Sequence, residues 1–164
     1  MVINIVCHNL IMNIYYLFID VFGCKTSKKL EWRSKIKLYS LYSVSSLLFG
    51  VIGLIAYTQS IISNMECAVL IMISTTSYLS DVIYIGVPHY IRCIDTILAT
   101  SIIFYYMLSA LFEYSNKSII SIFITCIGLI YFKQSIKSQK FEEMRYYHTM
   151  WHLIIQLGLC IYLL

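Results

Sequence analysis

The chain has 164 residues, of which 60% are hydrophobic and only 12% are charged. Soluble domains carry about 25% charged residues, and a soluble fold of this size buries only about 70% of the surface that its unfolded chain exposes. This composition excludes a soluble enzyme. The net charge of +4 needs no nucleic-acid partner, because the basic residues flank apolar segments and can meet anionic lipid. The sequence predicts one all-α transmembrane domain over residues 1–164, a polytopic helical bundle in the lipid bilayer.

About five or six transmembrane helices are expected, because a spanning helix needs roughly 20 mostly apolar residues. The first apolar stretch, residues 3–22, contains several polar side chains and is either a sixth span or a helix lying in the membrane interface. Four later segments have the required length, and a fifth, residues 118–132, is shorter but almost purely apolar. In chain order the predicted spans cover residues 38–57, 64–84, 93–112, 118–132 and 147–164.

The basic residues predict the orientation of the bundle. With five spans, eleven of the twelve lysines and arginines fall on one side of the membrane, and only Lys117 falls on the other. Because lysine and arginine concentrate in cytoplasmic loops, we expect the loops 24–37 and 133–145 to be cytoplasmic and the C-terminus to be extracytoplasmic. The sequon Asn116-Lys117-Ser118 would then lie in an outer loop, which agrees with this orientation.

The six cysteines are scattered, with no CxxC pair that would indicate a zinc ribbon. Most lie in apolar runs, where a free cysteine packs as a small hydrophobic residue. We therefore interpret all six as packing residues. They are Cys7, Cys24, Cys67, Cys93, Cys126 and Cys160.

Several ionisable residues lie inside the predicted spans, where each costs about 2.5–3.5 kcal/mol on insertion scales and usually serves function. Asp81 lies about one turn from the cytoplasmic end of the second span, and Asp95 lies a similar distance into the third. His148 and His152 occupy the first two turns of the last span, at the same end. Four ionisable groups from three helices are therefore predicted at one level of the membrane. Glu66 lies near the outer end of its span, where its carboxylate can reach the interface.

The spacing of the two histidines predicts a metal site. His148 and His152 are four residues apart, so both imidazoles lie on one helix face and can bind a single zinc ion. A catalytic zinc site needs three protein ligands and a water. Asp81 or His89 could supply the third ligand, and Asp95 could hold or deprotonate the water.

A second interpretation of the same residues is structural. Membrane histidines often form hydrogen bonds between helices, and a pair at this spacing also arises by chance. Asp81 and Asp95 could pair with Arg92 or His148 as a latch near the interface. Such a latch would bind no metal.

The segment His148-Thr-Met-Trp-His152-Leu, which opens the final span, resembles the last-helix HxxxH motif of the CREST superfamily. This superfamily includes the alkaline ceramidases, the progestin and adipoQ receptors and the haemolysin-III-like proteins. Ser77 and Asp95 match its serine late in the second helix and its aspartate early in the third. The resemblance implies a zinc ion held by histidines, with the aspartate and the serine supporting the catalytic water or the substrate carbonyl. The chain departs from the pattern at Asp81, where the family has histidine, and in having about five spans instead of seven.

The sequence thus predicts a hydrolase that cleaves an amide or ester in a lipid-like substrate with zinc-activated water. His148, His152 and Asp81 would be the metal ligands, Asp95 the partner of the water, and Ser77 a supporting hydrogen-bond donor. The alternative is a non-catalytic helical membrane protein, such as a scaffold or a channel-like subunit.

Overall fold

The computed structural model describes residues 35, 40–85 and 90–164. The predicted helix over residues 3–22, most of the basic loop 24–37 and His89 lie outside these residues. Every described element is a helix, and the described residues contain no strand. In chain order they are α2 (Leu41–Ser45), α3 (Leu48–Thr58), α4 (Asn64–Tyr78), the π-helical turn η2 (Leu79–Ile83), α5 (Tyr90–Glu113), α6 (Asn116–Lys137) and α7 (Phe141–Leu163).

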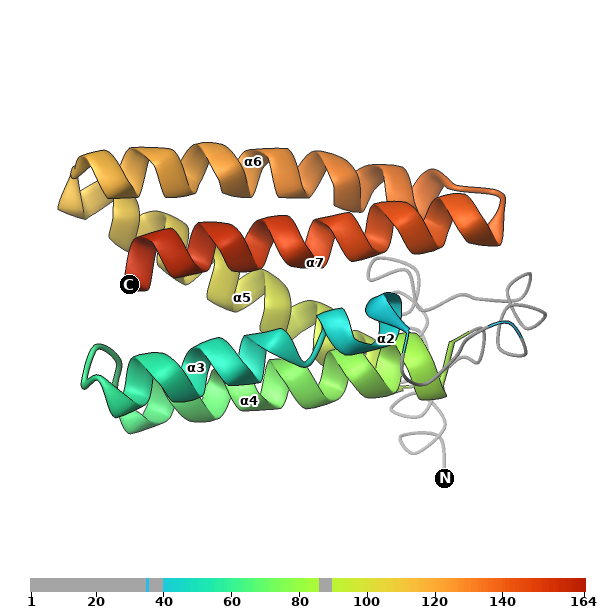
Figure 1. Ribbon diagram of the computed structural model, residues 1–164, viewed down its shortest axis with the longest axis horizontal. Coiled ribbons are helices and arrows are strands. Elements are labelled where there is room, and N and C mark those ends of the chain that lie inside the picture. Colours follow the sequence, from blue (N-terminus) through green and yellow to red (C-terminus); the bar gives the residue numbers. More distant parts are fainter. Residues whose placement is uncertain (1–34, 36–39, 86–89) are drawn as a thin grey trace, which may run out of the picture.

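The helices form two antiparallel pairs, α3 with α4 and α6 with α7, and α5 crosses obliquely between them (Figure 1). The short helix α2 continues the line of α3 and contacts α7. Few residues of α5 are buried within the bundle. Its apolar side chains, such as Phe104 and Phe112, instead lie on the outside, as expected for a helix that faces lipid.

Four helical segments of the described chain are long and apolar enough to cross a membrane. They are Leu41–Thr58, Asn64–Ile83, Tyr90–Glu113 and Asn116–Lys137. This result agrees with the predicted multi-pass bundle and with the first four of the five predicted spans. The shortest of these, 118–132, is extended at both ends.

The fifth predicted span, residues 147–164, is part of α7, which begins six residues earlier than predicted. α7 is long enough to cross a membrane, but it does not belong to the four apolar segments. The polar residues His148, His152 and Gln156 interrupt its apolar sequence. Its membrane crossing therefore stays a prediction.

Helix caps account for the positions of the turns between α3 and α4 and between α5 and α6. Ser63 and Glu66 form a capping box, in which each side chain accepts a hydrogen bond from the other residue's backbone N–H. Glu66, predicted only to reach the interface, thus helps to cap α4 from its first turn and also accepts a hydrogen bond from the Tyr105 hydroxyl.

The predicted sequon lies in the first turn of α6 and not in an open loop. Asn116 is the first residue of that helix, and Ser115 caps it by accepting from the backbone N–H of Ser118. The Ser118 hydroxyl is fully buried and donates to Glu113. This sequon therefore gives no support to the predicted orientation.

The cysteine prediction holds for some residues and is wrong for one. Cys67, Cys126 and Cys160 are free. Cys67 lies in the apolar core and Cys160 packs against it, whereas Cys126 is exposed on the outside of the bundle. Cys93 is disulfide-bonded, so it is not only a packing residue. Cys7 and Cys24 lie outside the described residues.

Candidate metal centre

Two irregular helical segments position the site, and both depart from α-helical geometry. The first α-helical segment is interrupted at Ser46 and Leu47, between α2 and α3. The second ends in the π-helical turn η2, where the backbone N–H of Tyr84 donates to the carbonyl of Leu79. Single π turns in α-helices occur frequently at functional sites, because the extra residue changes the direction in which side chains point. η2 contains Asp81.

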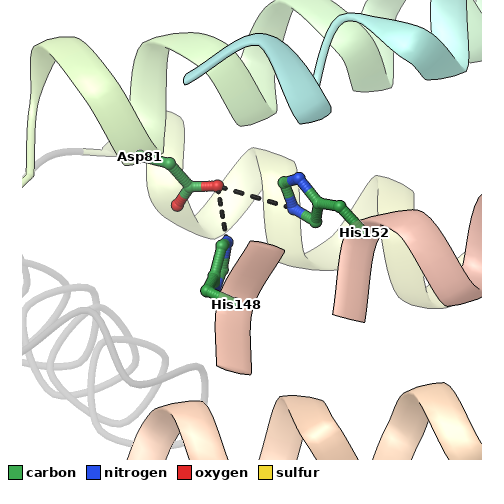
Figure 2. Close-up of side chains that lie close together, drawn as sticks. All are labelled: Asp81, His148 and His152. Carbon is green, nitrogen blue, oxygen red and sulfur yellow. Dashed lines mark hydrogen bonds and ion pairs between the residues drawn. The ribbon is translucent and has the colours of Figure 1, made fainter. Parts of the chain in front are cut away.

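One carboxylate oxygen of Asp81 faces both histidines of α7 (Figure 2). Its Oδ2 atom is 2.8 Å from Nε2 of His148 and 3.7 Å from Nε2 of His152. One ligand atom from each of the three residues lies within 4.8 Å of the others. All three side chains are largely shielded from solvent. The backbone carbonyl of Asp81 also accepts a hydrogen bond from the buried Tyr42 hydroxyl, which ties η2 to α2.

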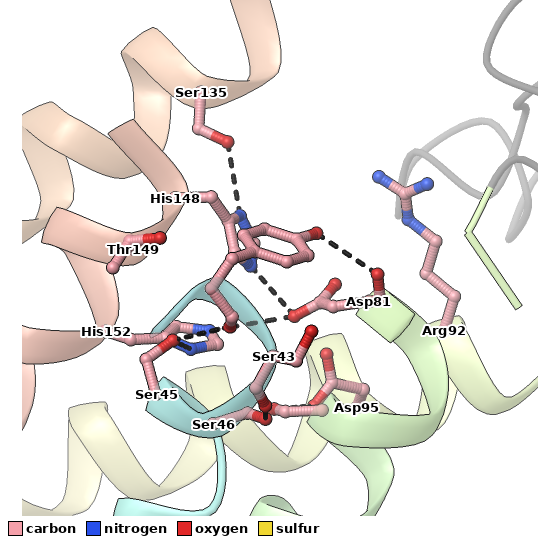
Figure 3. Close-up of polar contacts among 12 residues, drawn as sticks. Ser43, Ser45, Ser46, Asp81, Arg92, Asp95, Ser135, His148, Thr149 and His152 are labelled. Carbon is pink, nitrogen blue, oxygen red and sulfur yellow. Dashed lines mark hydrogen bonds and ion pairs between the residues drawn. The ribbon is translucent and has the colours of Figure 1, made fainter. Parts of the chain in front are cut away.

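The other ring nitrogen of each histidine contacts a serine on a different helix (Figure 3). Nδ1 of His152 is 3.2 Å from the Ser45 hydroxyl of α2, and Nδ1 of His148 is 3.1 Å from the Ser135 hydroxyl of α6. Both serines are almost completely buried. Metal-binding histidines characteristically hold their second nitrogen in such a hydrogen bond, which fixes the ring.

Gln156 continues the polar stripe of the two histidines along α7. Its side-chain amide donates to the backbone carbonyl of Ser45, at 2.6 Å. That carbonyl is at the end of α2, where the interruption leaves backbone groups without their usual helical partners. Gln156 therefore stabilises the interruption that places the Ser45 hydroxyl beside His152.

Asp95 and Ser77 form a second pair next to the first cluster. The Ser77 hydroxyl donates a short hydrogen bond to Oδ1 of Asp95, and the Thr76 hydroxyl donates to the same oxygen at 3.4 Å. These bonds hold the carboxylate of α5 against α4. The sequence allowed Asp81 and Asp95 to pair with Arg92 or His148. Asp81 pairs with His148, and no salt bridge joins Arg92 to either carboxylate among the described residues.

A cavity of about 230 Å³ adjoins these residues. At one end it is lined by Ser77, Asp95, His148 and His152. The rest of its wall is mostly apolar and comes from α3, α4, α5, α6 and α7. Two of its lining residues, Phe104 and Leu129, are also exposed on the outside of the bundle, on α5 and α6. The cavity thus joins a polar end to a lipid-facing surface.

The structure brings together all five residues that the sequence singled out. Four of them line the cavity, while Asp81 contacts both histidines from η2. The serines that contact the histidines were missed. Ser135 lies opposite His148 in the same antiparallel register that places Gly128 opposite Ile155, and this register comes from the structure and not from the sequence. Ser45 could not be found from the sequence either, because the interruption after α2 has no proline or glycine to mark it.

No family model matches the chain, and no curated protein and no solved structure matches it significantly. The resemblance to the CREST superfamily therefore rests on the sequence positions of Ser77, Asp95, His148 and His152 alone, and it stays a prediction.

Proposed function

We propose that this protein is a zinc-dependent hydrolase of the membrane interior, which cleaves an amide or ester bond in a lipid-like substrate. One observation carries the proposal: Asp81, His148 and His152 direct their ligand atoms to a common point beside a largely apolar cavity. Two imidazoles and one carboxylate are a common ligand set of catalytic zinc.

The distances suit a metal ion of this size. Zinc binds nitrogen and oxygen at about 2.0–2.2 Å in a tetrahedron, which puts two ligand atoms roughly 3.3 Å apart. The two separations from Asp81, 2.8 and 3.7 Å, lie on either side of that value. All three ligand atoms lie within 4.8 Å of one another, so zinc would have to draw them to the tetrahedral spacing.

Each nearby residue has a role in such a reaction. Bound zinc would lower the pKa of its water towards about 7 and polarise a carbonyl. Asp95, oriented by Ser77 and Thr76, would accept the proton of the water at Oδ and pass it to the leaving group. The apolar wall of the cavity would take the hydrocarbon part of the substrate and exclude bulk water from the reacting bond.

The distance between His148 and Asp81 favours the alternative, a non-catalytic scaffold or channel-like subunit. At 2.8 Å, Nε2 of His148 can donate directly to Asp81, and with Ser135 on Nδ1 the ring has both its hydrogen bonds without a metal. In that case the cluster would be a latch between η2, α6 and α7.

Zinc content separates the two functions. Protein purified in detergent without chelators should carry about one zinc per chain, and His152→Ala should lose it. Elemental analysis of both proteins measures this, and circular dichroism checks that the variant is folded. Metal-free, folded wild-type protein that also takes up no added zinc would leave the latch as the function of the cluster.

A further inference from the structure

We infer that Ser45 is a positioning residue that keeps the proton of His152 on Nδ1, so that the bare Nε2 atom faces Asp81 and binds a cation there. The inference deepens the proposed function and rests on it for the identity of the cation. Its geometric core concerns only which nitrogen of His152 carries the proton.

The Ser45 hydroxyl has a single proton and two neighbours that could take it. Oγ of Ser45 lies 2.8 Å from the backbone carbonyl of Tyr42, to which it donates, and 3.2 Å from Nδ1 of His152. A carbonyl oxygen can only accept, and a hydroxyl has one proton to give. The hydroxyl therefore accepts from His152, which requires a proton on Nδ1. A neutral imidazole has one N–H, so Nε2 of His152 is bare.

The bare nitrogen then faces another acceptor. Nε2 of His152 is 3.7 Å from Oδ2 of Asp81, and this oxygen already lies 2.8 Å from His148. A lone pair and a carboxylate oxygen that face each other in a buried site repel unless a positive charge lies between them. The orientation set by Ser45 therefore gives a cation site and disfavours a hydrogen-bonded latch at His152.

The proton of His148 is not confined to one ring nitrogen, so the two histidines differ in how they can face Asp81. The Ser135 hydroxyl can donate to Nδ1 of His148 or accept from it. Without a metal, Nε2–H of His148 can donate to Asp81, and with a metal the proton can move to Nδ1 and face Ser135. Ser45 thus fixes one ligand, while Ser135 lets the other adapt.

The test reads the proton position directly. In 15N-histidine spectra of the metal-free protein in detergent, a protonated ring nitrogen resonates well upfield of a bare one. A His152→Asn variant identifies the His152 signals. Wild-type protein should show a protonated Nδ1 and a bare Nε2, and Ser45→Ala should shift the population towards Nε2–H, which can then donate to Asp81.

Ser46→Ala is the matched control. Ser46 is equally buried at the same interruption, and its hydroxyl also donates three residues back, to the Ser43 carbonyl, but no contact joins it to a histidine in the described residues. This variant should leave the His152 signals unchanged. Either an Nε2–H tautomer or a doubly protonated ring in wild-type protein would overturn the inference, and so would an unchanged tautomer in folded Ser45→Ala.

Zinc competition with a chelating dye supplies the second measurement. Ser45→Ala should weaken zinc binding by roughly 10–100-fold, the usual loss when the partner of a metal-binding histidine is removed, while Ser46→Ala should not. If the tautomer is as inferred but wild-type protein binds no zinc, the proposed hydrolase fails and the role of Ser45 stands. If Ser45→Ala and Ser46→Ala bind zinc with equal affinity, Ser45 does not position His152 for metal binding.

Discussion

At the scale of single residues, the charge of Asp81 distinguishes this cluster from a set of three histidines. A carboxylate adds one negative charge to the ligand set, which strengthens its attraction for a divalent cation. It also gives His148 a hydrogen-bond acceptor when the metal is absent. The same residue therefore supports either the metal site or the latch, and replacing it separates them.

Asp81→His should keep zinc at about one per chain, because a third imidazole is also a usual zinc ligand. Asp81→Ala should lose most of the zinc, since two protein ligands remain. Elemental analysis of the two variants beside wild-type protein measures the difference. A latch gives a different result, in which Asp81→His removes the carboxylate acceptor of His148, lowers the melting temperature and holds no zinc.

Asp95→Asn should abolish most hydrolysis while leaving zinc bound. The amide keeps the size of the side chain and can still accept from Ser77, but it cannot take a proton from water. Loss of a general base typically costs about 10²–10⁴-fold in rate. A panel of fluorogenic acyl esters and amides in mixed micelles measures the activity. Normal turnover in the Asn variant would show that Asp95 does not carry the proton.

At the scale of helices, the long apolar segments were predictable and their interruptions were not. Hydrophobicity over 20 residues identifies a span, because every residue contributes to the cost of transfer. The break after α2 and the π turn η2 instead depend on contacts far along the chain: Gln156 donates to Ser45 across 111 residues, and Tyr42 donates to Asp81 across 39. No local sequence pattern encodes these bonds.

The site shows the same division between local and distant information. The shared helix face of His148 and His152 follows from helical spacing, and their expected depth in the membrane follows from the predicted spans. The sequence predicted that Ser77 and Asp95 belong to one site, but it did not predict the hydrogen bond between them. The contacts of the Asp81 carboxylate with the histidines depend on how η2 turns this side chain towards α7. The prediction used a period of 3.6 residues per turn, which does not hold in a π turn.

The close approach of α3 and α4 at Gly53 gives a prediction at this scale. A Cβ atom there would lie 2.9 Å from Cβ of Leu70, which cannot rotate away because it is attached to the backbone. Overpacking of this kind costs about 1–3 kcal/mol, more than the roughly 1 kcal/mol that alanine gains over glycine in a helix. Gly53→Ala should therefore lower the melting temperature in detergent.

Gly50→Ala is the control for this substitution. It lies one turn earlier on the same helix, but its Cβ would meet Oγ and Cβ of Ser74 at 3.1 and 3.2 Å, both farther away than the 2.9 Å contact at Gly53. We expect it to be less destabilising than Gly53→Ala in the same thermal scan. Equal melting temperatures for the two variants would mean that α3 and α4 separate easily at this contact.

At the scale of the whole molecule, the polar cluster lies at one end of the bundle, the end that contains the turn between α6 and α7 (Figure 1). The apolar cavity runs from this cluster into the bundle, and its wall includes lipid-exposed residues of α5 and α6. A lipid that enters from the bilayer would thus meet the cluster with a polar group near the membrane surface. The side of the membrane on which this happens depends on the orientation of the chain.

The orientation is the last prediction, and it follows from the basic residues. Lys133, Lys137, Lys140 and Arg145 surround the turn between α6 and α7, so this end of the bundle should be cytoplasmic. In a variant without other accessible cysteines, Gln139→Cys should resist a membrane-impermeant thiol reagent in intact cells, and Ser60→Cys at the opposite end should react. Cys93 is disulfide-bonded in the first turn of α5, at the same end as Gln139. Because disulfides persist mainly in oxidising compartments, this bond favours the opposite orientation. Labelling of Gln139→Cys from outside would overturn the prediction from the basic residues and place the disulfide, with the polar cluster, in such a compartment.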